Sequence, residues 1–175
     1  TPAPLALLPD CAALQQVALP ASVIQAAALV PASTARTGVP PLPAHCVVTV
    51  EVAARTGVDG VRYATRFELR LPQQWNGRFQ FMGGGGTDGN VRPAFGASNN
   101  GSRPALADGY AVVSSDIGHQ ATDPRDASFG LDPQARIDWG YNALDQVTTR
   151  AKTLIRAYYG RDAQYSYYVG CSGGG

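Results

Sequence analysis

The sequence predicts an α/β fold built on a mixed sheet, and three observations support this. Residues 63–71 alternate apolar with mostly charged side chains at a period of two, which is typical of an antiparallel strand with one buried face. Residues 110–115 form a mainly apolar run, typical of a parallel strand buried on both faces. An apolar stripe between residues 137 and 158 predicts a long helix, followed by a strand at 165–169.

The length and composition suit a chain that buries one core. It has 175 residues, of which 45% are hydrophobic and 15% charged. Residues 1–46, rich in Ala, Pro and Leu, are interpreted as an N-terminal extension, and residues 47–175 as the sheet-forming domain. Within the extension we expect two short helices, near Cys11–Gln16 and Pro20–Leu29.

The remaining elements are predicted from turn and cap residues. Two further strands are expected, at 46–52 and at 78–82, and a turn at 57–60 separates the first from the strand at 63–71. The long helix should begin at Asp132, a good N-cap with proline as the next residue, and end at Gly160. The strand at 165–169 is therefore the fifth that the sequence predicts.

The charge pattern excludes some classes of partner. The net charge is +1, from 14 basic and 13 acidic residues without a run of either sign. Nucleic acid and anionic membranes require a basic surface, so neither is expected as a partner. The sequence also has no stretch of the ~20 apolar residues that a membrane span needs.

The chain has three cysteines, so one of them stays without a partner if the other two form a disulfide. Cys11 and Cys46 would pair in an exported protein, stabilising it by about 3–4 kcal/mol in the chain-entropy model. The alternative is two buried thiols in a cytosolic protein. Cys171 is then either a small buried residue or half of a bridge whose partner lies outside this chain.

A nucleophile motif comes directly after the last predicted strand. Residues 170–174 read Gly-Cys-Ser-Gly-Gly and fit the G-x-S-x-G pattern of a nucleophile elbow. An elbow places a serine on a sharp strand-to-helix turn, so Ser172 is the candidate nucleophile and the backbone N–H of Gly173 a candidate oxyanion donor. A flexible glycine-rich turn is the alternative, but the position after a strand and a long helix favours the elbow.

A second glycine cluster, Gly83–Gly86, lies just after the strand at 78–82. In the α/β-hydrolase fold this loop supplies the other oxyanion donor. A floppy loop and a phosphate-binding loop are the alternatives. Neither a Walker Lys-Ser/Thr nor a convincing G-x-G-x-x-G pattern is present, which disfavours phosphate. The sequence therefore predicts the N-terminal half of an α/β-hydrolase sheet, with the elbow after the fifth strand.

The two histidines are poor candidates for the catalytic base. The triad of this fold runs in the order Ser, Asp or Glu, His, whereas His45 and His119 both precede Ser172. We expect His119 to line the pocket or to hydrogen-bond a loop. No His/Cys cluster has the spacing of metal ligands, and Asp88 and Asn90 are interpreted as turn formers.

Five motifs in order resemble the tannase and feruloyl esterase family: residues 71–79, the glycines at 83–86, residues 109–119, 157–160 and 170–174. The resemblance implies a secreted or periplasmic serine esterase for esters of aromatic acids such as gallate, ferulate or terephthalate. It implies oxyanion donors at Gly173 and at Gly84 or Gly85, and pairing of Cys171 with a cysteine next to the catalytic histidine. It also implies a lid domain that usually holds calcium.

The chain departs from that family pattern beyond Ser172. The lid, the acid and the histidine of the triad come later in the family, so the remainder of the polypeptide or a second chain would have to supply Asp and His. On its own, the chain is expected not to turn over efficiently. Two alternatives remain open at this point: a non-catalytic binding protein or inactive fragment that keeps the hydrolase sheet, and a nucleotide-binding domain that uses Gly83–Gly86.

Overall fold

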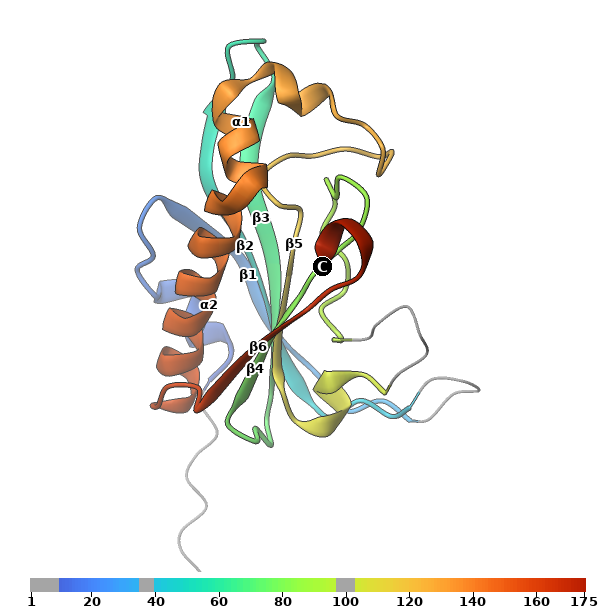
Figure 1. Ribbon diagram of the computed structural model, residues 1–175. Helices are drawn as coiled ribbons and strands as arrows, with labels where there is room; N and C mark the ends of the chain where they lie inside the picture. Colours follow the sequence, from blue (N-terminus) through green and yellow to red (C-terminus); the bar gives the residue numbers. More distant parts are fainter. Residues whose placement is uncertain (1–9, 35–39, 97–102) are drawn as a thin grey trace, which may run out of the picture.

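The computed structural model describes residues 10–34, 40–96 and 103–175, which form a six-stranded sheet of order β1-β2-β3-β5-β4-β6 (Figure 1). Its strands are β1 Ser22–Val30, β2 His45–Thr56, β3 Arg62–Pro72, β4 Arg78–Met82, β5 Ala111–Ser115 and β6 Tyr165–Val169. Neighbours from β1 to β5 pair antiparallel, whereas β4 is parallel to both β5 and β6. The predicted mixed sheet is confirmed, and the carboxyl ends of β4, β5 and β6 share one edge.

The centre of the sheet is built by the alternating residues of β3. Phe67 lies opposite Val50 of β2 and Ser115 of β5, and it is 1% exposed. The predicted outer face of β3 is only half exposed, because the segment after β4 covers it: Glu68 accepts a hydrogen bond from the Ala94 amide at 2.9 Å. The period-two prediction is therefore confirmed for the buried face.

The prediction of a helix at 20–29 is wrong, because this segment is strand β1. Its alanines favour a helix locally, but its backbone pairs with β2 from Ser22↔Val52 to Val30↔His45. The backbone hydrogen bonds that β1 forms with the edge of β2 outweigh the weak helical preference of its alanines. The elbow consequently comes after six strands instead of the five expected. The first expected helix is confirmed as the short 3-10 helix η1, Ala12–Gln16.

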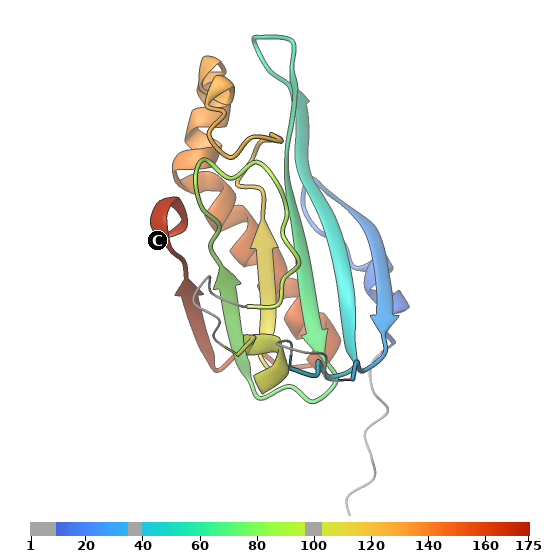
Figure 2. The same ribbon diagram turned by 90° about the vertical axis from the view of Figure 1, so that its right-hand side faces the viewer.

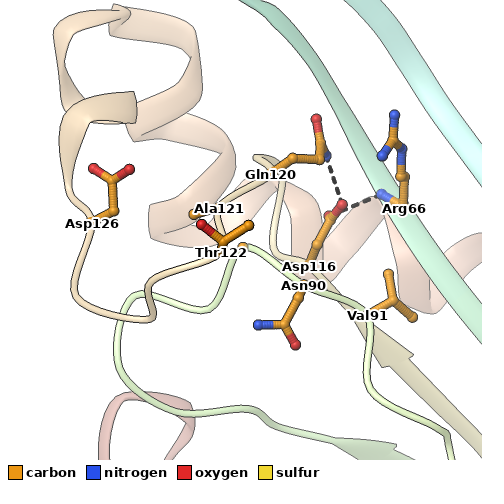
Figure 3. A pocket seen from close by; sticks show the side chains of 9 residues that line it. Arg66, Asn90, Val91, Asp116, Gln120, Ala121, Thr122 and Asp126 are labelled. Atoms are coloured by element: carbon orange, nitrogen blue, oxygen red, sulfur yellow. Dashed lines mark hydrogen bonds between the residues drawn. The ribbon is translucent and has the colours of Figure 1, made fainter.

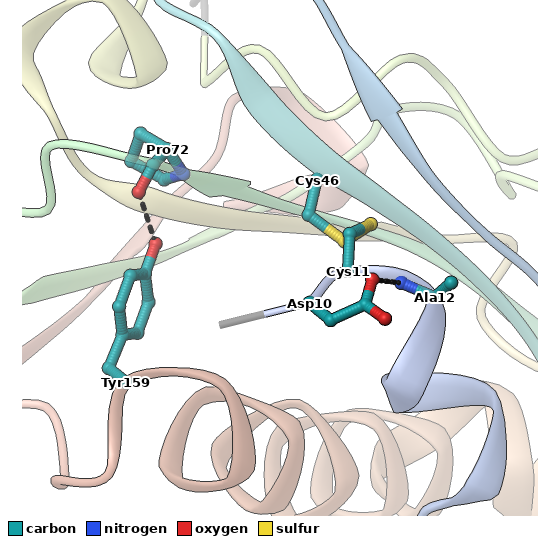
Figure 4. The surroundings of a disulfide bond; sticks show 6 residues. All are labelled: Asp10, Cys11, Ala12, Cys46, Pro72 and Tyr159. Atoms are coloured by element: carbon teal, nitrogen blue, oxygen red, sulfur yellow. Dashed lines mark hydrogen bonds between the residues drawn. A yellow bond between two sulfur atoms is a disulfide. The ribbon is translucent and has the colours of Figure 1, made fainter. Parts of the chain in front are cut away.

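The disulfide between Cys11 and Cys46 ties η1 to β2 (Figure 4). The two Cα atoms lie 5.6 Å apart, and Cys46 is fully buried. Nearby, the Tyr159 hydroxyl donates to the Pro72 carbonyl at 2.6 Å, which fastens the end of the long helix to the end of β3. The predicted pairing is confirmed, and it places Cys11 and Leu14 in the hydrophobic core.

The long helix consists of three consecutive segments. They are α1 Pro133–Ile137, the π-helical turn η4 Asp138–Asn142 and α2 Ala143–Tyr159. As predicted, the Asp132 side chain caps the start by accepting from the Ala135 amide at 2.7 Å, and Gly160 ends α2 in a left-handed conformation.

The apolar stripe of this helix was predicted correctly only for its second half. Ile137 is 41% and Tyr141 67% exposed, whereas Ala151 and Ile155 are fully buried. A π turn takes up an extra residue, so the stripe is rotated on crossing η4. An uninterrupted α-helix, which the prediction assumed, keeps one stripe along its length.

The two faces of the sheet are covered differently (Figures 1 and 2). Helix α2 packs along one face, and residues 83–96 with the short helix η2 Ala105–Asp108 lie over the other. The remaining short helices are η3 Ser128–Leu131 and η5 Ser172–Gly174. Among the described residues, no helix is both long and apolar enough to cross a membrane.

Candidate active site

The G-x-S-x-G segment forms a sharp bend at the carboxyl end of β6. Cys171 is still extended, with φ −147° and ψ 144°, whereas Ser172 has φ 58° and begins η5. A left-handed conformation at a non-glycine residue is uncommon and is the backbone state expected at a nucleophile elbow. A Cβ at Gly170 would collide with the carbonyl of Gly174, so the bend requires glycine at this position.

The glycine loop after β4 lies against this bend. The Gly83 amide donates to the Val169 carbonyl at 2.8 Å, which extends the β4–β6 ladder into the loop. A Cβ at Gly173 would collide with the Gly86 carbonyl, and one at Gly174 would lie 2.6 Å from the Gly84 nitrogen. The structure thus brings together the elbow and the loop that the sequence separates by almost ninety positions.

Asp88 organises the turn at the end of this loop. It is 8% exposed and has φ 59°; its amide donates to the Gly85 carbonyl at 3.2 Å, and its carboxylate accepts from the Gly85 amide. Burial raises the pKa of this carboxyl. The sequence identified Asp88 as a turn former, but nothing in the Asp-Gly pattern indicated that its side chain is buried beside the elbow.

Two cavities flank the elbow. One, of about 190 Å³, lies over the carboxyl ends of β4 and β6 and is lined by Met82, Gly84, Phe95 and Cys171, among others. The other, of about 310 Å³, lies on the helix side and includes Gly173 and Trp139 in its lining.

Trp139 belongs to the π turn η4, which presents it to the glycine loop. The Trp139 indole N–H donates to the Thr87 carbonyl at 3.2 Å. π turns recur at functional sites because they redirect side chains within a helix. Sequence reasoning missed Trp139, because a regular helix would not have singled it out.

A polar cleft of about 610 Å³ opens beyond the end of β5 (Figure 3). At its base Asp116, 1% exposed, accepts from the Arg66 amide at 2.9 Å and from the Gln120 side chain at 2.7 Å. Burial raises the pKa of Asp116 to about 7. No residue of the elbow lines this cleft, so it lies beside the candidate active site.

Both histidines are buried away from the nucleophile. The His119 ring stacks on Phe129 with centroids 4.0 Å apart, and neither of its nitrogens has a hydrogen-bond partner among the described residues. Burial lowers the pKa of His119. His45 contacts the Pro43 carbonyl at 2.7 Å and Arg70 at 2.9 Å. Neither ring is hydrogen-bonded to Ser172.

Cys171 is exposed and forms no disulfide within the described part of the chain. In the same residues, no three His, Cys, Asp or Glu side chains are grouped so that they could hold a metal ion.

A serine in left-handed conformation after a parallel strand, with a glycine loop at its side, defines the N-terminal half of an α/β-hydrolase. Solved structures show the same fold. Feruloyl esterase B from Aspergillus oryzae matches with a TM-score of 0.74 and 24% identity, over 94% of this chain and 32% of that chain. Tannin acyl hydrolase from Aspergillus niger matches with a TM-score of 0.61 and 21% identity, over 95% of this chain and 32% of that chain.

The chain belongs to the tannase and feruloyl esterase family, whose model matches residues 46–175. It is 44% identical over 162 residues to the mono(2-hydroxyethyl) terephthalate hydrolase of Piscinibacter sakaiensis, covering 89% of this chain and 27% of the relative. It is 38% identical over 117 residues to a probable feruloyl esterase B-2 of Aspergillus flavus, covering 65% of this chain and 20% of the relative. The chain thus spans between a fifth and about a quarter of these relatives.

Proposed function

We propose that this chain is the nucleophile-bearing part of a serine esterase that hydrolyses esters of aromatic acids of the gallate, ferulate or terephthalate type. The observation that carries the proposal is the left-handed Ser172 at the end of β6, packed against the backbone of the Gly83–Gly86 loop. Family membership supports ester hydrolysis, and the names of the relatives support an aromatic acyl group.

In the proposed reaction the Ser172 hydroxyl oxygen attacks the ester carbonyl and its proton passes to a base. The N–H of Gly173 and one N–H of the glycine loop, at Gly84 or Gly85, stabilise the negative charge on the tetrahedral intermediate. The alcohol then leaves with the proton from the base, and water hydrolyses the acyl-enzyme to release the aromatic acid.

The base and the acid that orients it would come from outside this chain. His45 and His119 are buried elsewhere, so we propose that a histidine and an aspartate from the remainder of the polypeptide, or from a second chain, complete the triad. The exposed Cys171 supports this arrangement, because a disulfide there would bring the histidine segment to the elbow. A lid carrying calcium remains part of the proposal.

The Cys11–Cys46 disulfide is consistent with an oxidising compartment, since such bonds are rare in the cytosol. We therefore propose that the protein is secreted or periplasmic.

Hydrolysis of methyl gallate, methyl ferulate and mono(2-hydroxyethyl) terephthalate by the complete gene product tests the role of Ser172. We expect Ser172→Ala to lower kcat by at least about 10³-fold, because the nucleophile is lost. Ser166→Ala is the matched control, since Ser166 lies six positions earlier on β6, outside the bend that carries Ser172, and should keep most of the activity. Equal rates for the wild type and Ser172→Ala would remove Ser172 from the mechanism.

One observation favours a second candidate, a binding protein that keeps the hydrolase sheet without chemistry: no histidine of the chain lies at Ser172. An alkyl fluorophosphonate separates the two. Labelling at Ser172 of the complete gene product supports an activated nucleophile, whereas intact protein that binds aromatic esters but is neither labelled nor active supports the binding protein.

A further inference from the structure

One arginine differs from the others in having no partner for its guanidinium group. Within residues 10–34, 40–96 and 103–175, the Arg92 side chain forms no ion pair, no hydrogen bond and no contact with an aromatic ring, whereas every other arginine there has at least one of these partners. No residue outside these ranges is acidic. Arg92 is half-buried, and a cation withdrawn from water without a counter-charge is unfavourable, so we expect its partner to come from outside this chain.

Arg92 lines the cavity of about 190 Å³ beside the elbow, which it shares with Phe95 and Cys171. Its guanidinium extends toward the glycine loop, since a Cβ added at Gly85 would lie 4.0 Å from Arg92 Nη2. No other residue that lines this cavity in the described chain is charged, and most of them are apolar or glycine. The cavity therefore carries a positive charge next to the residues that precede Ser172.

A buried amide lines the same cavity. Gln80 lies in the middle of β4, where it pairs with Val112 of β5 and Tyr167 of β6. It is 6% exposed, and its side chain forms no hydrogen bond with another residue that the structure describes. A buried amide without a partner is unfavourable, so an occupant of the cavity is expected to bind Gln80 as well as Arg92.

The backbone that carries Arg92 is held on both sides. The Ser114 hydroxyl donates to the Arg92 carbonyl, and the Ala94 amide donates to the Glu68 carboxylate at 2.9 Å. These bonds tie the chain before and after Pro93 to β5 and β3. The guanidinium is therefore presented to the cavity from a fixed main chain.

We propose that Arg92 and Gln80 form a binding site for a carboxylate group in the cavity beside the elbow. A carboxylate accepts paired N–H donors from a guanidinium, and the Gln80 amide supplies a further donor. One guanidinium balances one negative charge, so a phosphate dianion would stay half compensated within a largely apolar lining.

Two sources can supply this carboxylate. The first is the substrate, because a terephthalate half-ester carries a free carboxylate on its ring, whereas alkyl gallates and ferulates carry none. The second is an acidic side chain of the remainder of the polypeptide, which a disulfide at Cys171 would bring to the same cavity. The substrate source rests on the proposed function of Ser172, whereas the carboxylate site itself does not.

Binding to the complete gene product with Ser172→Ala tests the site without turnover. The two probes are mono(2-hydroxyethyl) terephthalate and 2-hydroxyethyl benzoate, which has the same ester but no second carboxylate, and calorimetry measures both affinities. If the substrate supplies the carboxylate, Arg92→Gln should weaken the acid by about 10- to 100-fold and the benzoate by less than about twofold, because charge-assisted hydrogen bonds are lost.

The controls separate charge from packing. Arg92→Lys keeps the charge without the paired donors, so it should recover part of the lost affinity. Arg125→Gln, at a side chain that is 90% exposed, should bind both probes as its parent does. If Arg92→Gln does not fold, Gln80→Leu keeps the test, since it removes the amide at similar volume and should weaken the acid selectively by about 3- to 10-fold.

The second source gives a different result. If the remainder of the polypeptide supplies the carboxylate, Arg92→Gln should lower the melting temperature and weaken both probes alike, and Arg92→Lys should restore part of the melting temperature.

Unchanged affinities and an unchanged melting temperature in Arg92→Gln would overturn the proposal. An Arg92→Lys variant no better than Arg92→Gln in both measurements would also overturn it, because the arginine would then act by packing alone. Full activity of Ser172→Ala in the ester assay would refute the proposed function, while the difference between the acid and the neutral probe would still decide the carboxylate site.

Discussion

Two regions of the sheet differ in backbone conformation and in the pairing of their acidic side chains. One is the antiparallel side, strands β1 to β3, and the other is the carboxyl edge, where the parallel strands β4, β5 and β6 end. On the antiparallel side, Glu51 accepts hydrogen bonds from Arg62 and Arg66, and Asp132 accepts from Arg55. These partners hold the pKa of Glu51 and that of Asp132 below their usual range. Glu51, which links β2 to β3, and Asp132, which links β2 to the start of the long helix, are thus stabilised as carboxylates.

At the carboxyl edge, by contrast, several residues have a strained backbone conformation, and the buried acids Asp88 and Asp116 form no ion pair with a described residue. Left-handed conformations occur at Asp88, Ile117 and Ser172, three of the five such non-glycine residues described. Burial raises the pKa of Asp88 and that of Asp116, opposite to the shifts across the sheet. Conformations of this kind persist only where the surroundings hold them. The comparison indicates that the well-packed antiparallel strands support the strained edge on which the candidate active site lies.

Among substitutions on the antiparallel side, we expect the largest loss of stability at Phe67 in the centre of β3. Phe67→Ala should lower the free energy of unfolding by about 3–5 kcal/mol, because it leaves a cavity where the side chain is 1% exposed. Chemical denaturation of the complete gene product measures this. Val58→Ala, at a site 80% exposed in the β2–β3 turn, should change the free energy by less than about 0.5 kcal/mol. Equal losses at the two sites would contradict the assigned core.

The same comparison shows which parts of the molecule local patterns can predict. The alternation in β3, the Asp132 cap and the Gly160 stop are written in neighbouring residues, and the structure confirms them. The G-x-S-x-G and Gly83–Gly86 motifs likewise indicated which segments would meet.

The features that the sequence did not reveal depend on non-local pairing. Strand β1 is set by the free edge of β2, which outweighs its helical composition. The π turn that presents Trp139 has no local pattern that separates it from regular helix. The bond from Asp88 to Gly85 is short in sequence, but its burial depends on segments that arrive more than thirty residues later.

The next largest effect is expected from the disulfide that anchors the extension to the antiparallel side. Replacing Cys11 and Cys46 together by serine should lower the free energy of unfolding by about 3–4 kcal/mol, because it releases a loop with a sequence separation of 35 in the unfolded chain. Esterase kcat at a temperature where the variant remains folded should stay near wild type. A fall in kcat without loss of stability would show that the extension shapes the carboxyl edge directly.

The smallest effect concerns pH and tests whether the carboxyl edge carries an unfavourable buried charge. Asp116 has a pKa of about 7 in the folded protein against an ordinary value of 3.8, so the folded state holds the proton more tightly. Its contribution to stability is therefore highest below about pH 4, falls as the pH rises toward 7, and is constant above that. Between about pH 5.5 and pH 7 the contribution of Asp116 to the free energy of unfolding falls by about 2 kcal/mol.

Asp116→Asn isolates this contribution, because an asparagine does not titrate. The difference in unfolding free energy between variant and wild type should shift in favour of the variant by about 2 kcal/mol when the pH is raised from about 5.5 to about 7.5. Other titrating groups cancel in the difference, provided that they lie far from residue 116. A difference that stays flat with pH would mean that the amide of Arg66 and the side chain of Gln120 stabilise the carboxylate fully. Asp116 would then resemble Asp132, and the contrast between the two sides would rest on backbone strain and on the buried Asp88.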